Sequence, residues 1–249
     1  MYNKPVRPVL VVIAHGSRDP RHAATVHALV RRVRSLRPGL RVETGFLDFN
    51  IPSVHGVLES LAAEGVRDVV ALPLLLTRAF HAKADIPAVL RDAPPQLRIR
   101  QAEVLGPSPL LLSALERRLY EAGLTPADKS STGVVLASAG SSDPEAIAVI
   151  AEIAREWRHT GWCAVRPAFA SASLPRTEDA VRELRDLGCA RVAVAPYVLA
   201  PGFLPDRIAR GAAEADVLAE VLGPAPEVAR LLLERYDAAR TPALTAVGA

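Results

Sequence analysis

The sequence predicts an α/β protein made of two tandem, doubly wound lobes, each with a four-stranded parallel sheet flanked by helices. Three observations support this prediction: half of the 249 residues are apolar, strand-like runs alternate with helix-like segments, and the two halves of the chain resemble each other. Because strands that alternate with helices are joined by right-handed βαβ crossovers, the alternation favours a parallel sheet in each half.

The internal repeat is visible in short stretches that recur in the same order. The stretch VVIAHGSRDP (11–20) returns as VVLASAGSSDP (134–144), and AEVLGPSP (102–109) returns as AEVLGPAP (219–226). Self-similarity of this kind indicates a tandem duplication, here of a unit of about 120 residues.

The repeat also defines the expected domain boundaries. We expect an amino-terminal lobe at 1–122, a carboxyl-terminal lobe at 133–249 and a polar, turn-rich linker at 123–132. In the first lobe the strand-like runs lie at 8–14, 41–47, 67–76 and 98–104, and the helix-like segments at 20–36, 53–64, 83–91 and 108–121. Asp19-Pro20 is a good helix start, because aspartate caps a helix and the proline ring presets the backbone φ.

Composition argues against several classes of function. The net charge is +3 and aromatic residues make up 4% of the chain, so stacking platforms for single-stranded nucleic acid are scarce. No apolar run reaches the length of about 18 residues that a membrane span needs, and the amino terminus lacks a signal-peptide core. We therefore expect a cytoplasmic protein that binds neither nucleic acid nor membranes. Cys163 and Cys189 form no CxxC motif and are expected to be inert core residues.

Polar side chains follow three of the predicted strands in the first lobe. In open parallel sheets, functional groups lie just past the carboxyl ends of the strands. His15, Asp48 and His81 each follow a strand-like run, so we expect them to be neighbours at one rim of the first sheet. The other histidines are expected at the surface, and His22 is the first exception to consider because it lies one turn from the rim; they are His22, His27, His55 and His159.

The second half of the chain serves as an internal control for this site. In the aligned repeat, the positions of His15, Asp48 and His81 hold Ala139, Ser171 and Leu204. A histidine needed only to build the strand-to-loop corner would be needed equally in both lobes. The loss of all three polar groups from one copy therefore favours chemistry at the rim of the first lobe.

Two imidazoles and a carboxylate suit two kinds of chemistry. They could bind a divalent metal such as iron, cobalt, nickel or zinc, with coordination positions left open for a catalytic or transfer reaction. They could also perform acid–base catalysis near neutral pH. The HGSRDP turn is neither a dinucleotide fingerprint nor a P-loop, and it lacks the Gly-x-Ser-x-Gly pattern of a nucleophile elbow.

Three motifs together resemble those of the class II tetrapyrrole chelatases, and specifically the sirohydrochlorin chelatases. The motifs are VIAHGSRDP (12–20), GFLDFNIPSV (45–54) and LPLLLTRAFHAKADIP (72–87). The resemblance covers the first half strongly, and the second half is similar to the degenerate lobe of the long, fused form. It implies two chelatase-like lobes, of which the first carries the chemistry.

The resemblance implies a lyase-type chelatase that inserts a divalent metal into sirohydrochlorin and releases two protons. Iron, our first choice, would give sirohaem, and cobalt would give a cobalamin precursor; no organic cofactor is implied. Metal binding and catalysis are assigned to His15 and His81, and to Asp48, where the family has glutamate. The side chain of Asp48 is one methylene shorter, so direct ligation and action through a water both stay open.

The resemblance also assigns substrate binding to residues beside the motifs. Sirohydrochlorin carries eight carboxylates, so cations and helix-start N–H groups are expected to line its cleft. The candidates are Gly16, Ser17, Arg18, Arg21, Arg78 and Lys83, with Phe80 as apolar surface for the ring. The alternatives are a metal or tetrapyrrole carrier without turnover and a scaffold that binds a phosphorylated metabolite. Either a monomer or a homodimer is compatible with the sequence.

Overall fold

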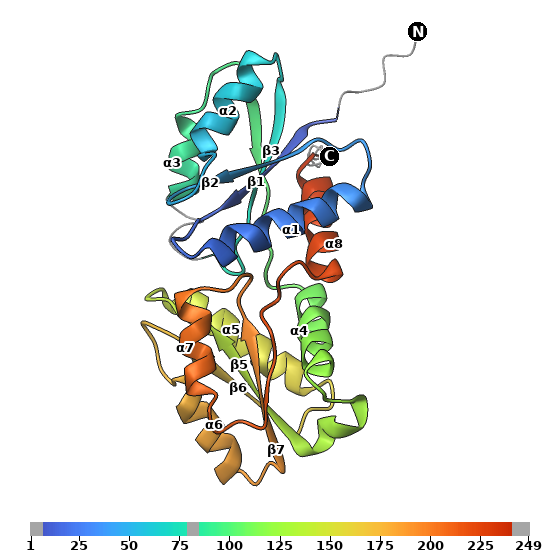
Figure 1. The fold of residues 1–249 in the computed structure, drawn as a ribbon, viewed down its shortest axis with the longest axis vertical. Coiled ribbons are helices and arrows are strands. Elements are labelled where there is room, and N and C mark those ends of the chain that lie inside the picture. Colours follow the sequence, from blue (N-terminus) through green and yellow to red (C-terminus); the bar gives the residue numbers. More distant parts are fainter. Residues whose placement is uncertain (1–6, 79–84, 241–249) are drawn as a thin grey trace, which may run out of the picture.

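Two lobes lie end to end along the long axis of the molecule (Figure 1). This computed structural model describes residues 7–78 and 85–240. Each lobe holds a four-stranded sheet in which every pair of neighbouring strands is parallel. The strand order is β2-β1-β3-β4 in the first sheet and β6-β5-β7-β8 in the second. The predicted fold class is confirmed.

The elements follow the predicted alternation closely. The strands are β1 (Val9–Ala14), β2 (Val42–Phe46), β3 (Asp68–Pro73), β4 (Arg98–Gln101), β5 (Thr132–Ser138), β6 (Ala164–Phe169), β7 (Arg191–Tyr197) and β8 (Val217–Leu218). The helices are α1 (Pro20–Leu36), α2 (Val54–Ala63), α3 (Ile86–Arg91), α4 (Pro109–Glu121), the 3-10 helix η2 (Pro126–Ser131), α5 (Pro144–Arg158), α6 (Thr177–Asp186), α7 (Phe203–Gly211) and α8 (Pro226–Arg240). None of the helices in the described ranges is long and apolar enough to cross a membrane.

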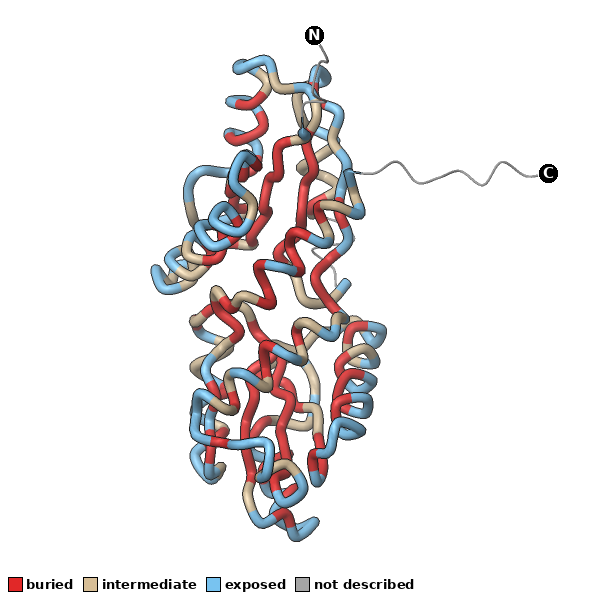
Figure 2. Tube along the Cα trace, turned by 90° about the vertical axis from the view of Figure 1, so that its right-hand side faces the viewer, coloured by how far each residue is buried: buried red, intermediate tan, exposed pale blue. Residues whose placement is uncertain are grey.

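Helices cover both faces of each sheet. In the first lobe, α2 and α3 pack on one face, and α1 and α8 pack on the other. Successive residues of β1 point to opposite faces, so Val11 packs towards α2 while Leu10 and Val12 pack towards α1. A strand buried on both faces reads as a continuous apolar run, which explains the sequence of β1. Figure 2 shows these buried strands running through each lobe between partly exposed helices.

The last helix of each half crosses to the other lobe. Helix α8 ends the second half but packs against α1, β3 and β4 of the first lobe, whereas α4 ends the first half but packs against β7 (Figure 1). The two crossing helices also contact each other, and Arg117 of α4 forms an ion pair with Glu227 of α8. The spatial packing thus exchanges one helix between the two repeated halves, and the expected boundaries at 1–122 and 133–249 stay a prediction.

One apolar core runs through both lobes as a result. It combines buried residues of β1 and β3 with residues of β5 and β7, and it includes residues of both crossing helices. Leu115 of α4 and Leu232 of α8 are both fully buried within it. Side-chain packing in this core therefore fixes the relative position of the lobes, in addition to the peptide segment that links the halves.

Replacing Leu232 with alanine should lower the free energy of unfolding by about 3 kcal/mol, because the change removes apolar contacts and leaves a cavity. Urea unfolding followed by circular dichroism should show one transition at lower urea concentration. Leu187, which follows the last residue of α6, is 54% exposed. Leu187→Ala is therefore the control and should change the free energy of unfolding by less than about 0.5 kcal/mol. An unchanged urea midpoint in the Leu232 variant would contradict the packing of α8 into this core.

Candidate active site

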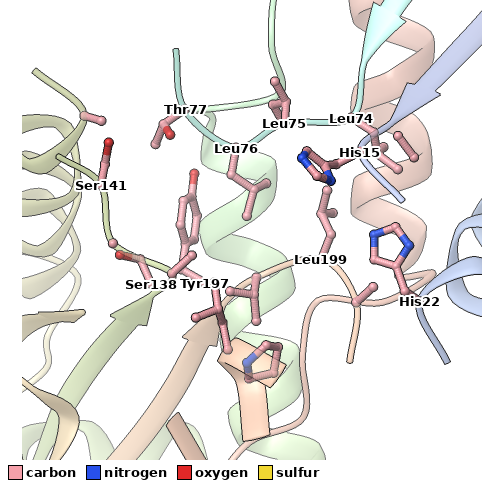
Figure 3. A pocket seen from close by; sticks show the side chains of 18 of the residues that line it. His15, His22, Leu74, Leu75, Leu76, Thr77, Ser138, Ser141, Tyr197 and Leu199 are labelled. Carbon is pink, nitrogen blue, oxygen red and sulfur yellow. The ribbon is translucent and has the colours of Figure 1, made fainter. Parts of the chain in front are cut away.

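A cavity of about 350 Å³ lies between the lobes, next to the carboxyl ends of their central strands (Figure 3). Its apolar walls include Leu74, Leu75 and Leu76 from the first lobe and Val198, Leu199 and Ala200 from the second. Its polar lining residues are His15, His22, Thr25, Thr77, Ser138, Ser141 and Tyr197. A mostly apolar cavity with a few polar groups is typical of a small-molecule site. The run Leu74–Leu76 was predicted as the end of a strand, but it leaves the sheet after Pro73 and forms this wall.

His15 directly follows β1 and is held in place by the loop after β2. The Leu47 N–H donates to the carbonyl of Ala14 at 2.9 Å, and the Asp48 N–H donates to the carbonyl of His15 at 2.9 Å. The imidazole is half-buried and lines the cavity, and its ring centroid lies 6.4 Å from that of Phe49. Backbone hydrogen bonds from the loop after β2 thus fix the position of the residue that carries this imidazole.

The turn after β1 requires glycine at position 16. Gly16 has a φ of +95°, and an added Cβ would lie only 1.8 Å from the carbonyl oxygen of Asp48. The Ser17 N–H donates to Oδ1 of Asn50 at 2.8 Å, and Ser17 Oγ accepts from the Asp19 N–H at 3.1 Å. Gly16 and Ser17 therefore shape the corner, and neither belongs to the described lining of the cavity.

The second lobe builds the same corner without a histidine. The Ser171 N–H donates to the carbonyl of Ala139 at 3.0 Å. Gly140 has a φ of +90°, and an added Cβ would lie 1.9 Å from the carbonyl oxygen of Ser171. Strand pairing places Ala139 at the position that His15 occupies in the first lobe. Because the corner folds with alanine, the imidazole of His15 is not needed to build it.

The predicted cluster of two histidines and one carboxylate is only partly visible. His81, Phe80 and Lys83 lie outside the described residues. Asp48 is exposed and does not belong to the described lining, although its backbone contacts the turn that follows His15. Within 7–78 and 85–240, no three His, Cys, Asp or Glu residues are grouped to hold a metal ion. The meeting of all three side chains stays a prediction.

Arg18 and Arg78 are exposed and contact other side chains. The guanidinium carbon of Arg18 lies 5.2 Å from the centroid of the Phe49 ring, which is the geometry of a cation–π contact. Nη2 of Arg78 lies 3.5 Å from a carboxylate oxygen of Glu103. Both arginines stay outside the described lining of the cavity, so contact with a ligand would involve parts of that ligand that extend beyond it.

Arg21 joins the two lobes near the cavity. Its guanidinium lies 2.6 Å from a carboxylate oxygen of Asp19 and 2.7 Å from one of Asp206, which belongs to α7 of the other lobe. These hydrogen bonds raise the pKa of Arg21 above its usual value. His22, Leu204 and Pro205, the sequence neighbours of this pair, line the cavity. The sequence assigned Arg21 to substrate carboxylates, and the structure shows it bound to carboxylates of the chain itself.

His22 lines the cavity, although it was not among the site residues predicted from the sequence and was named there only as the first exception to a surface position. It was expected at the surface, but it is half-buried, lines the cavity beside His15 (Figure 3), and its Nδ1 is buried without a hydrogen-bond partner in the described structure. Burial and the charge of His15 lower the pKa of His22, although Asp19 opposes them. The imidazole is therefore neutral near pH 7. The repeat offered a signal, because the second lobe has Ala146 at this position.

Tyr197 contributes a phenol from the second lobe. It ends β7 and is 2% exposed, and burial raises the pKa of its hydroxyl. The hydroxyl lies against Gly106 of the first half, where an added Cβ would approach it to 2.5 Å. Because residue 106 is glycine, the Tyr197 hydroxyl can pack against the first half of the chain at the edge of the cavity.

A family profile and two curated relatives match this chain over most of its length. The CbiX family profile matches residues 9–122 and 133–239. The sirohydrochlorin cobaltochelatase of Priestia megaterium is 31% identical over 206 residues, which cover 80% of this chain and 66% of that protein. The sirohydrochlorin ferrochelatase of the same organism is 27% identical over 203 residues, which cover 80% of this chain and 76% of that protein.

A solved structure has the same fold over nearly the whole chain. SirB from Bacillus subtilis with Fe3+ superposes with a TM-score of 0.81 at 25% identity, covering 95% of this chain and 96% of that one. Fold and site together define a two-lobed α/β protein with a histidine-bearing cavity between parallel sheets. The chain belongs to the CbiX family, the sirohydrochlorin chelatase family that its motifs resemble.

Replacing Gly16 with alanine should lower the free energy of unfolding by about 2 kcal/mol more than replacing Gly39, measured by urea denaturation. Both glycines have positive φ, at +95° and +82°, but nothing lies within 4 Å of a Cβ added to Gly39. The difference between the variants therefore isolates the contact with the Asp48 backbone. Equal losses in both variants would show that this close approach is not a constraint.

Proposed function

We propose that this protein is a sirohydrochlorin chelatase, which inserts a divalent metal ion into the macrocycle with release of two pyrrole protons. The observation that carries the proposal is the imidazole of His15 in an apolar cavity between two lobes, at a position where the duplicated lobe has alanine. Family membership over most of the chain and relatives named for this activity support it.

The proposed reaction needs groups that hold a metal ion and groups that take up protons. A neutral imidazole can donate a lone pair to a divalent ion, and it can accept a proton near neutral pH. We assign these roles to His15 and His81, with Asp48 stabilising the developing positive charge directly or through a water. His22 supports the assignment, because it adds a second imidazole to the cavity beside His15, one whose pKa is lowered by burial.

Iron is the first candidate for the inserted metal and cobalt the second. The relatives are named for both metals, one as a cobaltochelatase and one as a ferrochelatase. Imidazole and carboxylate donors suit either ion, so selection depends on geometry and on metal supply more than on the type of donor. Spectrophotometric assays of sirohydrochlorin with Fe²⁺, Co²⁺ and Ni²⁺ in turn would rank the metals.

The apolar walls of the cavity suit the face of a macrocycle, and the arginines around it suit its carboxylates. Leu74, Leu75 and Leu76 present apolar surface from the first lobe. We propose that Arg18, Arg21 and Arg78 bind substrate carboxylates that project beyond the cavity. Gly16, Ser17, Phe80 and Lys83 remain candidates from the motifs, and a cytoplasmic location stays a prediction.

His15→Ala should reduce the rate of metal insertion at least about 100-fold, because it removes a group that acts in the reaction itself. The rate is measured by the change in sirohydrochlorin absorbance, with protein far below substrate concentration. His159→Ala, at an exposed site in the second lobe, is the control and should retain the full rate. Many turnovers by the wild type would exclude a carrier, whereas an unchanged rate in the His15 variant would overturn the assignment.

Asp206→Asn should lower the KM for sirohydrochlorin about threefold, because weakening the ion pair frees Arg21 for a substrate carboxylate and exposed pairs of this kind contribute up to about 1 kcal/mol. Arg21→Gln should raise the KM, and neither change should alter kcat. Glu214→Gln removes the same charge from an exposed site in the same lobe and should leave the KM unchanged. Competition between Asp206 and substrate is ruled out if Asp206→Asn has the wild-type KM.

A further inference from the structure

The two cysteines of the chain lie in contact in the second lobe. Their Sγ atoms are 3.6 Å apart, although 26 positions separate them in sequence. Cys163 directly precedes β6, and Cys189 lies two residues before β7. Strand β5 runs between β6 and β7 in the sheet, so the two thiols reach each other across the start of the central strand.

Gly133 on β5 provides the space for this contact. An added Cβ on Gly133 would lie 2.8 Å from Sγ of Cys189 and 3.3 Å from its Cβ. The first lobe fills the same region with apolar side chains, since its strand register places Val9 at the position of Gly133 and Val66 at that of Cys189. Only the second lobe combines a glycine with a pair of thiols, so the pair is not a requirement of the repeated fold.

The two thiols differ in accessibility. Cys163 is exposed, which corrects the expectation that both cysteines belong to the core, whereas Cys189 is 6% exposed. Burial, together with the hydrogen bond to Cys163, raises the pKa of Cys189 to about 11. An oxidant in solution therefore reaches Cys163 first, while Cys189 is buried directly beside it.

We propose that Cys163 and Cys189 form an oxidation site at which a peroxide produces an intramolecular disulfide. The sulfurs need to approach by only about 1.5 Å to reach the S–S bond length of about 2.05 Å. An exposed thiol next to a second thiol is the arrangement in which a first oxidation product is captured as a disulfide before it is oxidised further.

The chemistry is balanced with hydrogen peroxide as the oxidant. The Cys163 thiolate attacks one peroxide oxygen, the O–O bond breaks, and the departing hydroxide takes a proton to give water and a sulfenic acid on Cys163. The sulfur of Cys189 then attacks the sulfur of Cys163, the S–O bond breaks, and the departing hydroxide takes the proton of Cys189 as a second water. Two thiols lose two hydrogens and two electrons, and one peroxide is reduced to two waters.

The oxidation site is remote from the cavity. The cysteines lie at the Gly133 end of β5, whereas the cavity is lined by Ser138 at the other end of this strand. Five residues of strand correspond to about 17 Å. Oxidation should therefore leave the rate of metal insertion unchanged, which makes its test independent of the proposed function.

The experiment treats the reduced full-length protein with hydrogen peroxide and measures its intact mass. The wild type should lose two hydrogens, peptide mapping without reductant should join the segments that contain Cys163 and Cys189, and dithiothreitol should reverse the change. Cys189→Ser should instead accumulate a sulfenic acid that a dimedone probe traps. Cys163→Ser should stay unmodified at Cys189 while the protein is folded.

Two results would overturn the proposal. One is a wild type that keeps both free thiols under conditions in which Cys189→Ser is oxidised at Cys163. The other is oxidation of wild-type Cys163 to sulfinic or sulfonic acid without a cross-linked peptide. The second result is read from peptide mapping of the wild type alone, so poor folding of Cys189→Ser would still leave the proposal open to refutation.

Discussion

The exchange of helices α4 and α8 is the constraint on which the rest of the structure depends. A parallel sheet needs cover on both faces, and in this chain part of the cover of one face of each sheet comes from the opposite half of the sequence. The exchanged helices also contact each other, so the two sheets share one core. This core sets the spacing of the lobes and therefore the width of the cavity between their strand ends.

The equivalent turns after β1 and β5 show which features of the duplicated unit serve the fold and which serve the site. Gly16 and Gly140 have nearly the same φ, and a Cβ added to either would lie at nearly the same distance from a carbonyl oxygen. The side chains around them have diverged, because His15 faces the cavity from the first lobe and Ala139 from the second. The backbone contact preserves the geometry, so the second copy forms the same turn with Ala139 in place of the histidine.

The fold could be predicted from the sequence because its signals are local. Alternating apolar periods and Asp-Pro helix starts depend on neighbouring residues, and they located most elements of the first lobe within a few positions. The repeat needs only a comparison of the two halves of the chain. The exchange of α4 and α8 had no such signal, since an amphipathic helix covers either sheet equally well. The repeat shows that two helices are equivalent, but it does not show which sheet each one covers.

The site was predicted less completely for the same physical reason. His15 was recognised because it ends a strand, a position that the sequence marks. His22 was not, because the inward direction of a residue in the first turn of a helix depends on the opposite lobe. The pairing of Arg21 with Asp206, separated by 185 positions, and the exposure of Cys163 likewise depend on contacts between distant segments.

The crossing helices have a consequence for how the chain can be divided. A cut in the connection between Glu121 and Thr132 would leave two fragments, each carrying a helix that belongs on the sheet of the other. Neither fragment could fully bury the face of its sheet that the exchanged helix helps to cover, so the fragments would be driven to reassociate and interlock. Continuity of the polypeptide thus acts chiefly as a tether that keeps the two complementary pieces at high effective concentration.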